Sequence, residues 1–184
     1  MSKKTLQTLN VEDYILYILN KLEPEKSDKI RLNKLAFLIE FSYLYHFNKD
    51  LSEANYAAID HGPVIDKYEK ILKNMQKKNL IKMDGYIIRP LKSSSKNISE
   101  ETCGFIDSVI EKYSRLTNTE LIGLSHLTDA YKITTDNERI MGKLIDKKLA
   151  LLETFFDDTE NAQSMSEDDL PEVDRDQLTP YEHR

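Results

Sequence analysis

The stretch IRLNKLAFLIEFSYLYHF, residues 30–47, decides the fold of this chain. At about 100° of rotation per residue, a helix built from it is apolar on two opposite sides. One side carries Leu35, Leu38, Ile39 and Tyr45, and the other carries Phe37, Phe41 and Leu44. A helix that is apolar on both sides needs neighbours on both sides. The stretch therefore predicts a central helix with other helices packed around it.

Further helices are predicted on either side of this stretch. Residues Val11 to Leu22 have apolar positions at three- and four-residue spacing, and Asn10 is a suitable N-cap. Ser99 is a suitable cap for a helix that extends to Tyr113, and a shorter helix follows Asn118-Thr119-Glu120. A last helix is predicted from Asp136 or Asn137, with its apolar face formed by Met141, Leu144, Ile145, Leu149, Leu152 and Phe156.

Two short segments interrupt these helical patterns. The first is Asp60-His61-Gly62-Pro63-Val64, a corner that follows residues 55–60, which could form a short strand or an extended approach to the corner. Gly62 has access to backbone angles that are closed to other residues, and Pro63 suits the first turn of a helix predicted to begin at Val64. The second interruption is residues 125–131, with the sequence SHLTDAY.

The helix predicted after the corner has one apolar and one basic face. Its basic face consists of Lys67, Lys70, Lys73, Lys77 and Lys78. Residues 80–90 follow, where Asp84-Gly85 lies between two β-prone runs and predicts a hairpin. The loop at residues 92–97 separates the two halves of the chain. The predicted fold class is mainly α: a compact helical domain with a small β-hairpin or winged-helix-like sheet.

Charge divides the chain into a body and a tail. The net charge is −6 over 184 residues. Residues 157–184 hold ten acidic side chains against Arg175 and Arg184, a balance of −8, which leaves residues 1–156 at +2. We predict a helical domain at 1–156 and a disordered acidic tail at 157–184. Such a tail most often improves solubility, and the alternatives are a nucleic-acid mimic or a segment that folds on a basic partner.

The sequence lacks the patterns of the common enzyme and metal sites. The four histidines and the single Cys103 have no metal-ligand spacing, and Gly62 is too isolated from other glycines for a phosphate-binding loop. Ser125, His126 and Asp129 have the residue types of a catalytic triad but no glycine elbow. We expect no enzymatic activity, no cofactor and no metal. The polar start and the short apolar runs predict a cytoplasmic protein without a membrane segment.

Nucleic-acid binding is one functional interpretation. A strand, a lysine-faced helix and a basic hairpin follow one another in the order of a winged-helix module. However, the helix face offers no arginine, the usual reader of guanine, so the contacts would mostly be to the nucleic-acid backbone. The candidate contacts are Lys67, Lys70, Lys73, Lys77, Lys82 and Arg89.

Three sequence islands together resemble the Panacea domain, the SocA-like antitoxin family. These are Lys34-Leu35 in the central helix, Gly62-Pro63-Val64 at the corner, and Ser125-His126 followed by Tyr131. Their order and spacing are similar to the family's over roughly residues 11–156. Tyr131 stands where the family usually has tryptophan.

The resemblance implies an antitoxin that neutralises a co-encoded toxin by direct binding. It also implies alternatives: an adaptor that delivers a partner to an AAA+ protease, or, since members are frequent in phages and prophages, an inhibitor of a host protein. We expect the two interruptions to lie together and to form or support the toxin-binding surface. The alternative is that they only hold the two halves together. The candidate partner-binding residues are His61, Gly62, Pro63, Val64, Tyr68, His126 and Tyr131.

Overall fold

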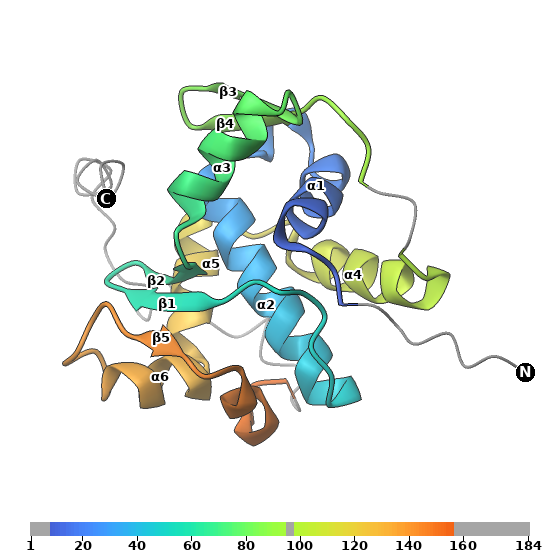
Figure 1. Ribbon diagram of the computed structural model, residues 1–184. Helices are drawn as coiled ribbons and strands as arrows, with labels where there is room; N and C mark the ends of the chain where they lie inside the picture. Colours follow the sequence, from blue (N-terminus) through green and yellow to red (C-terminus); the bar gives the residue numbers. More distant parts are fainter. Residues whose placement is uncertain (1–7, 95–97, 157–184) are drawn as a thin grey trace, which may run out of the picture.

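A single long helix, α2 (Lys29–Phe47), forms the middle of the protein in the computed structural model, which describes residues 8–94 and 98–156. Every residue from Arg31 to Leu44 is buried. The side chain of Asp28 caps the helix by accepting a hydrogen bond from the Arg31 backbone, and Asn48 ends it in the left-handed conformation. Other helices surround α2 (Figure 1). The prediction of a central helix is confirmed.

Two surrounding helices begin at their predicted caps: Asn10 caps α1 (Val11–Lys21), and Ser99 caps α4 (Glu100–Tyr113). Helix α5 (Asn118–Leu127) begins slightly earlier than predicted, at a capping box formed by Thr117 and Glu120. A short 3₁₀ helix, η1 (Pro24–Lys26), lies between α1 and α2. Helix α6 (Asp129–Thr135) follows α5 after one extended residue, Thr128.

A three-stranded antiparallel sheet packs beside α2. It has the order β2-β1-β5, with bounds β1 (Tyr56–Ile59), β2 (Gly62–Ile65) and β5 (Leu144–Ile145). Tyr56 is paired with Ile65 on one side and with Ile145 on the other, which joins the last part of the described chain to its middle. Of the two interpretations of residues 55–60, the short strand is therefore the correct one, and it is β1.

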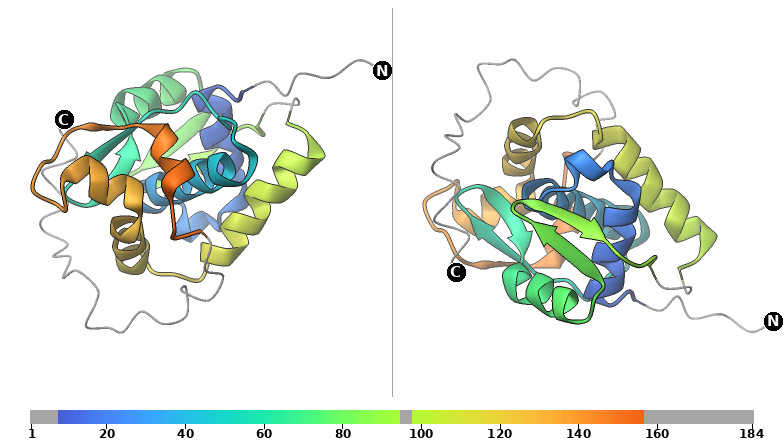
Figure 2. Two further views of the ribbon diagram at one scale, coloured as in Figure 1. Left: turned by 90° about the horizontal axis from the view of Figure 1, so that it is seen from below. Right: turned by 90° about the horizontal axis from the view of Figure 1, so that it is seen from above.

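Helix α3 (Tyr68–Lys77) and the hairpin of β3 (Ile81–Asp84) and β4 (Ile87–Pro90) cover the start of α2. Figure 2 shows this cap in the view from above. The Lys29 backbone donates to the Tyr86 carbonyl at the hairpin tip, and the Ile88 backbone donates to the carbonyl of Ser27. The hairpin prediction is confirmed. Together, the helices and two small sheets confirm the predicted mainly α fold class.

The prediction that a helix begins at Val64 is wrong. Pro63 and Val64 belong to β2, and the helix begins at Tyr68. Pro63 is tolerated in the strand because it lies opposite Ala58, whose backbone N–H and C=O both bond to the segment before β5. The β1–β2 ladder therefore needs no N–H donor at position 63, and proline removes no hydrogen bond from the sheet.

The prediction of a long last helix from residue 136 is also wrong. Asp136, Asn137 and Glu138 all have positive φ, and the chain then forms β5 and a short 3₁₀ helix, η2 (Lys147–Leu152). Pairing of Ile145 with Tyr56 replaces the helical register that the aliphatic spacing predicted. Residues 157–184, the acidic tail, lie outside the described residues. Across 8–94 and 98–156, none of the helices has the length and apolarity needed to cross a membrane.

Candidate functional site

The Gly62 corner is a tight hairpin turn between β1 and β2. Asp60 and His61 form the two-residue turn, and Gly62 follows with a φ of +84°. A Cβ added at Gly62 would lie 2.5 Å from Ser125 Oγ, 3.1 Å from Lys34 Nζ and 3.1 Å from His126 Cδ2. Gly62 is thus required both by its backbone conformation and by the close approach of α2 and α5.

Two polar residues of α2 hold strand β2 in place. The Nδ2 group of Asn33 is bonded to its own helix, while its Oδ1 accepts a hydrogen bond from the Ile65 backbone at 2.9 Å. Lys34 Nζ donates to the carbonyl of Pro63, also at 2.9 Å. Lys34 is buried and forms no ion pair with another described residue, and its burial lowers its pKa to about 7.

His126 lies against the same corner. Its Nδ1 is 2.7 Å from Glu138 Oε1, and its ring lies 4.5 Å from that of Tyr131 at an angle of 30°. Burial lowers the pKa of His126, and the nearby charges of Lys34 and His61 lower it further. The Glu138 carboxylate acts in the opposite direction and raises it. The neutral ring donates from Nδ1 to the carboxylate, so its Nε2 carries a lone pair. That buried Nε2 has no hydrogen-bond partner among the described residues.

Tyr131 connects α6 to the same place. Its side chain is buried, and its hydroxyl donates to the carbonyl of Ile59, the last residue of β1, at 2.8 Å. The two interruptions of the sequence therefore meet in space. We call the group they form the corner junction: Lys34, Gly62, Pro63, Ser125, His126 and Tyr131.

The second interruption is narrower than predicted. Ser125 and His126 belong to the last turn of α5 and Tyr131 belongs to α6, so only Thr128 is extended between the helices. The buried carboxylate of Glu153 accepts hydrogen bonds from the first two backbone N–H groups of α6, at Asp129 and Ala130. Burial raises the pKa of Glu153, and these two bonds oppose the shift.

The predicted partner-binding residues fall into two groups by accessibility. Gly62, Pro63 and Tyr131 are buried, while the others are half-buried: His61, Val64, Tyr68 and His126. The side chain of His126 is only 14% exposed. The corner junction therefore presents a few accessible side chains over a buried polar base.

The six predicted nucleic-acid contacts all have exposed side chains. Lys82 and Arg89 are direct cross-strand partners on β3 and β4. Lys67 lies 3.6 Å from Asp66, whereas the other five make no ion pair with another described residue. Lys70, Lys73 and Lys77, at three- and four-residue spacing on α3, form what we call the lysine face.

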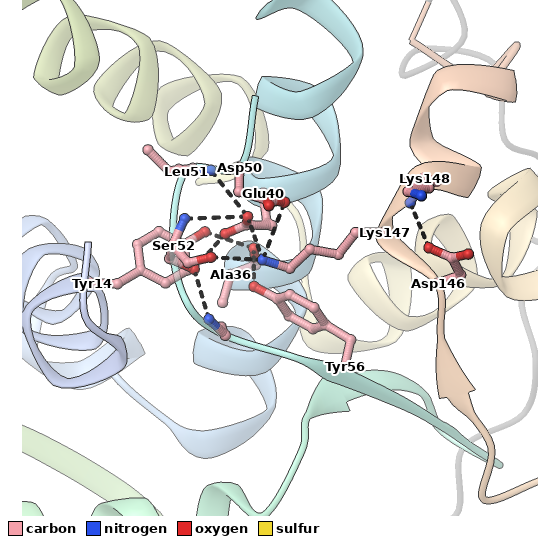
Figure 3. Close-up of polar contacts among 11 residues, drawn as sticks. Tyr14, Ala36, Glu40, Asp50, Leu51, Ser52, Tyr56, Asp146, Lys147 and Lys148 are labelled. Carbon is pink, nitrogen blue, oxygen red and sulfur yellow. Dashed lines mark hydrogen bonds and ion pairs between the residues drawn. The ribbon is translucent and has the colours of Figure 1, made fainter. Parts of the chain in front are cut away.

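A second buried polar cluster, which the sequence reasoning missed, lies at the other end of α2 (Figure 3). The Glu40 carboxylate is fully buried and accepts hydrogen bonds from the Leu51 and Ser52 backbones, from the Ser52 hydroxyl and from Lys147 Nζ at 2.9 Å. Burial raises the pKa of Glu40, and Lys147 is the largest influence against the shift. This cluster fastens η2 to α2.

The carbonyl of Ala36, one turn before Glu40, is part of the same region. The hydroxyls of Tyr14 from α1 and Tyr56 from β1 both donate to it, at 2.7 and 2.9 Å (Figure 3). The signal that could have found these sites is the presence of Asn33, Lys34 and Glu40 in a helix otherwise apolar on two sides. Among the described residues, no group of three or more His, Cys, Asp or Glu side chains could hold a metal ion.

Comparison with protein-family models gives a match that spans the middle of the chain. A family model described as "Antitoxin SocA-like, Panacea domain" matches residues 32–132. This range begins in α2 and ends in α6, so it contains every member of the corner junction and the lysine face. The curated proteins gave no match, and neither did the solved structures.

Proposed function

The chain belongs to the SocA-like Panacea antitoxin family, whose model matches more than half of it, and from that premise we propose that it neutralises a co-encoded toxin by direct protein–protein binding. The observation that carries the proposal is the family match across the corner junction. The proposal assigns toxin binding to residues 1–156, keeps the acidic residues 157–184 as a separate segment, and places the protein in the cytoplasm. Its chemistry is recognition, without catalysis.

The binding surface that we propose consists of three half-buried residues beside the corner junction, which we call its rim: His61, Val64 and Tyr68. A protein interface needs side chains that are already ordered before the partner arrives, because ordering them on binding reduces the affinity. Here the carbonyl of Pro63 accepts a hydrogen bond from the buried Lys34. The carbonyl at the end of β1 accepts one from Tyr131. A tyrosine on such a base is a suitable central contact, and an aliphatic neighbour helps to exclude water from it.

The buried members of the junction then support this surface from below. Gly62, Pro63 and Tyr131 have too little exposed area to contact a partner directly. Replacing them is expected to reduce neutralisation through loss of the fold. Variants of the rim residues distinguish loss of the binding surface from loss of the fold. A charge at Val64 changes the surface while leaving the buried hydrogen bonds intact.

The experiment is co-expression with the product of the neighbouring gene. We expect wild-type protein to restore growth and Val64→Glu to fail to do so, with an unchanged circular dichroism spectrum and melting temperature. Leu91→Glu is the matched control, since Leu91 is an aliphatic residue just after β4 of the separate β3–β4 sheet and is 55% exposed. It should restore growth. If Val64→Glu is unstable, His61→Asp tests the same surface. A folded rim variant that restores growth fully would contradict the proposed surface.

A further inference from the structure

The lysine face of α3 has no acidic partner in the described structure. The side chains of Lys70, Lys73 and Lys77 are exposed and make no ion pair with another described residue. Glu69, the one acidic residue of α3, is buried on the other side and pairs with Lys29 at 3.0 Å. Helix α3 lies at the periphery in both views of Figure 2. A helix face with three unpaired cations attracts anions strongly.

The opposite charge is present in the same chain. Residues 157–184 hold ten acidic side chains and two arginines. We propose that this acidic segment lies against the lysine face of α3 and acts as an intramolecular cover that competes with other polyanions. The proposal goes beyond the toxin-binding function and does not depend on it.

The geometry allows this contact. The segment begins after Phe156, whose ring lies 5.9 Å from that of Tyr45 near the end of α2. The lysine face lies near the other end, where Glu69 of α3 meets Lys29. The two points are about 24 Å apart along α2 at about 1.5 Å per residue.

The acidic segment is long enough for that path. At about 3.3 Å per extended residue, the residues from 157 to 167 span about 36 Å, roughly one and a half times the direct distance. The run Glu167-Asp168-Asp169 therefore reaches α3 along such a path, and the acids after it can lie along the helix. Because the segment is tethered, its effective concentration at α3 is on the order of millimolar, which favours even a weak contact.

Such a cover would weaken the binding of polyanions more than the binding of a toxin. A free lysine face binds nucleic acid and other polyanions without sequence preference, through release of counterions. A tethered acidic segment raises the concentration of polyanion needed to occupy the face. It does not compete directly for His61 and Val64, which lie in the β1–β2 turn and in β2 rather than on α3.

Zero-length carbodiimide cross-linking of the full-length protein tests the contact. At low protein concentration and 50 mM salt, we expect carboxylates of residues 157–184 to cross-link to Lys70, Lys73 and Lys77, and these products to disappear at 0.5 M salt. Lys148 is the proximity control, because it is exposed and close in sequence to the segment. Cross-links spread evenly over exposed lysines, or confined to Lys148, would overturn the proposal.

Binding of a random-sequence 20-base-pair duplex tests the competition. A full-length variant with all ten acidic residues of 157–184 changed to their amides should bind the duplex about tenfold more tightly than wild type at low salt. In that background, K70E/K73E/K77E should remove the gain. K49E/K112E/K143E, which changes the same number of exposed charges elsewhere, should lower the affinity less. Equal duplex affinity of the wild type and the amide variant would overturn the proposal.

Discussion

The ammonium group of Lys34 donates a hydrogen bond to the carbonyl oxygen of Pro63 at 2.9 Å, inside the protein and without an acidic partner among the described residues. This contact joins the central helix to the corner that carries the proposed binding surface. It also places a group whose pKa is lowered to about 7 at the base of that surface. The stability of the corner should therefore depend on pH.

The first prediction concerns that pH dependence. Between about pH 7 and pH 10.5, Lys34 is neutral in the folded protein and protonated in the unfolded chain. The unfolded state then binds more protons, so the free energy of unfolding contributed by Lys34 rises with pH across this window and is flat below it. This rise in the free energy of unfolding amounts to up to a few kcal/mol, and Lys34→Met should remove it. Urea unfolding from pH 6 to 10 measures it, with exposed Lys112→Met as the control. A parallel pH profile in the Lys34 variant would contradict the assignment.

The second prediction isolates the close approach at Gly62. Gly62→Ala should destabilise the protein by about 2–4 kcal/mol, from a left-handed conformation and a clash with Ser125 and Lys34 together. Gly142 has a similar φ of +81° but nothing within 4 Å of an added Cβ. Gly142→Ala should therefore cost only about 1 kcal/mol. Chemical denaturation of both variants gives the comparison, and equal losses would show that the contact at Gly62 is loose.

The third prediction concerns the buried pair of Glu40 and Lys147. Lys147→Met leaves a buried carboxylate without its cation and should cost about 3–5 kcal/mol. Combining it with Glu40→Gln should recover much of that loss, so the double-mutant cycle should show strong coupling. The exposed pair Glu23 and Lys26 is the control, with changes within about 0.5 kcal/mol. Additive losses at the buried pair would contradict the account.

The fourth prediction tests the link between α6 and β1. Tyr131→Phe removes the hydrogen bond to the Ile59 carbonyl and should destabilise the protein by about 1–2 kcal/mol. Tyr86→Phe is the matched control, because Tyr86 is 54% exposed at the tip of the β3–β4 hairpin. Thermal unfolding of the two variants should differ clearly. No difference would show that the Tyr131 hydroxyl contributes little.

The sequence predicted those parts of the fold that depend on local signals. Caps at Asn10 and Ser99, the two-sided apolar pattern of α2 and the Asp84-Gly85 hairpin all depend on neighbouring residues, and all are confirmed. The two failures have different causes. Val64 lies in a strand because β1 pairs with it across the short turn Asp60-His61, which lacks the Asn-Gly or Asp-Gly signal of a hairpin. Ile145 lies in a strand because it pairs with the distant Tyr56.

The sequence identified the residues of the candidate site better than it identified how those residues are buried and held together. The islands around Gly62 and His126 indicated that two segments meet, yet their spacing says nothing about burial. Lys34 was noted only as part of a sequence island, because a lysine in a helix is usually exposed. Its place beneath Pro63 follows from three-dimensional packing. The positions of Glu138 and Glu153 likewise depend on the irregular path of residues 136–156.

The measurement that tests the central claim most directly is the affinity of the purified protein for the product of its neighbouring gene. Isothermal titration should show tight binding by wild type and Leu91→Glu, and a loss of at least about 100-fold for Val64→Glu, the range expected for a charge buried at the centre of an interface. Failure of the wild-type protein to bind the neighbouring gene product would contradict direct neutralisation. Tight binding by folded Val64→Glu would instead contradict the corner as the binding surface.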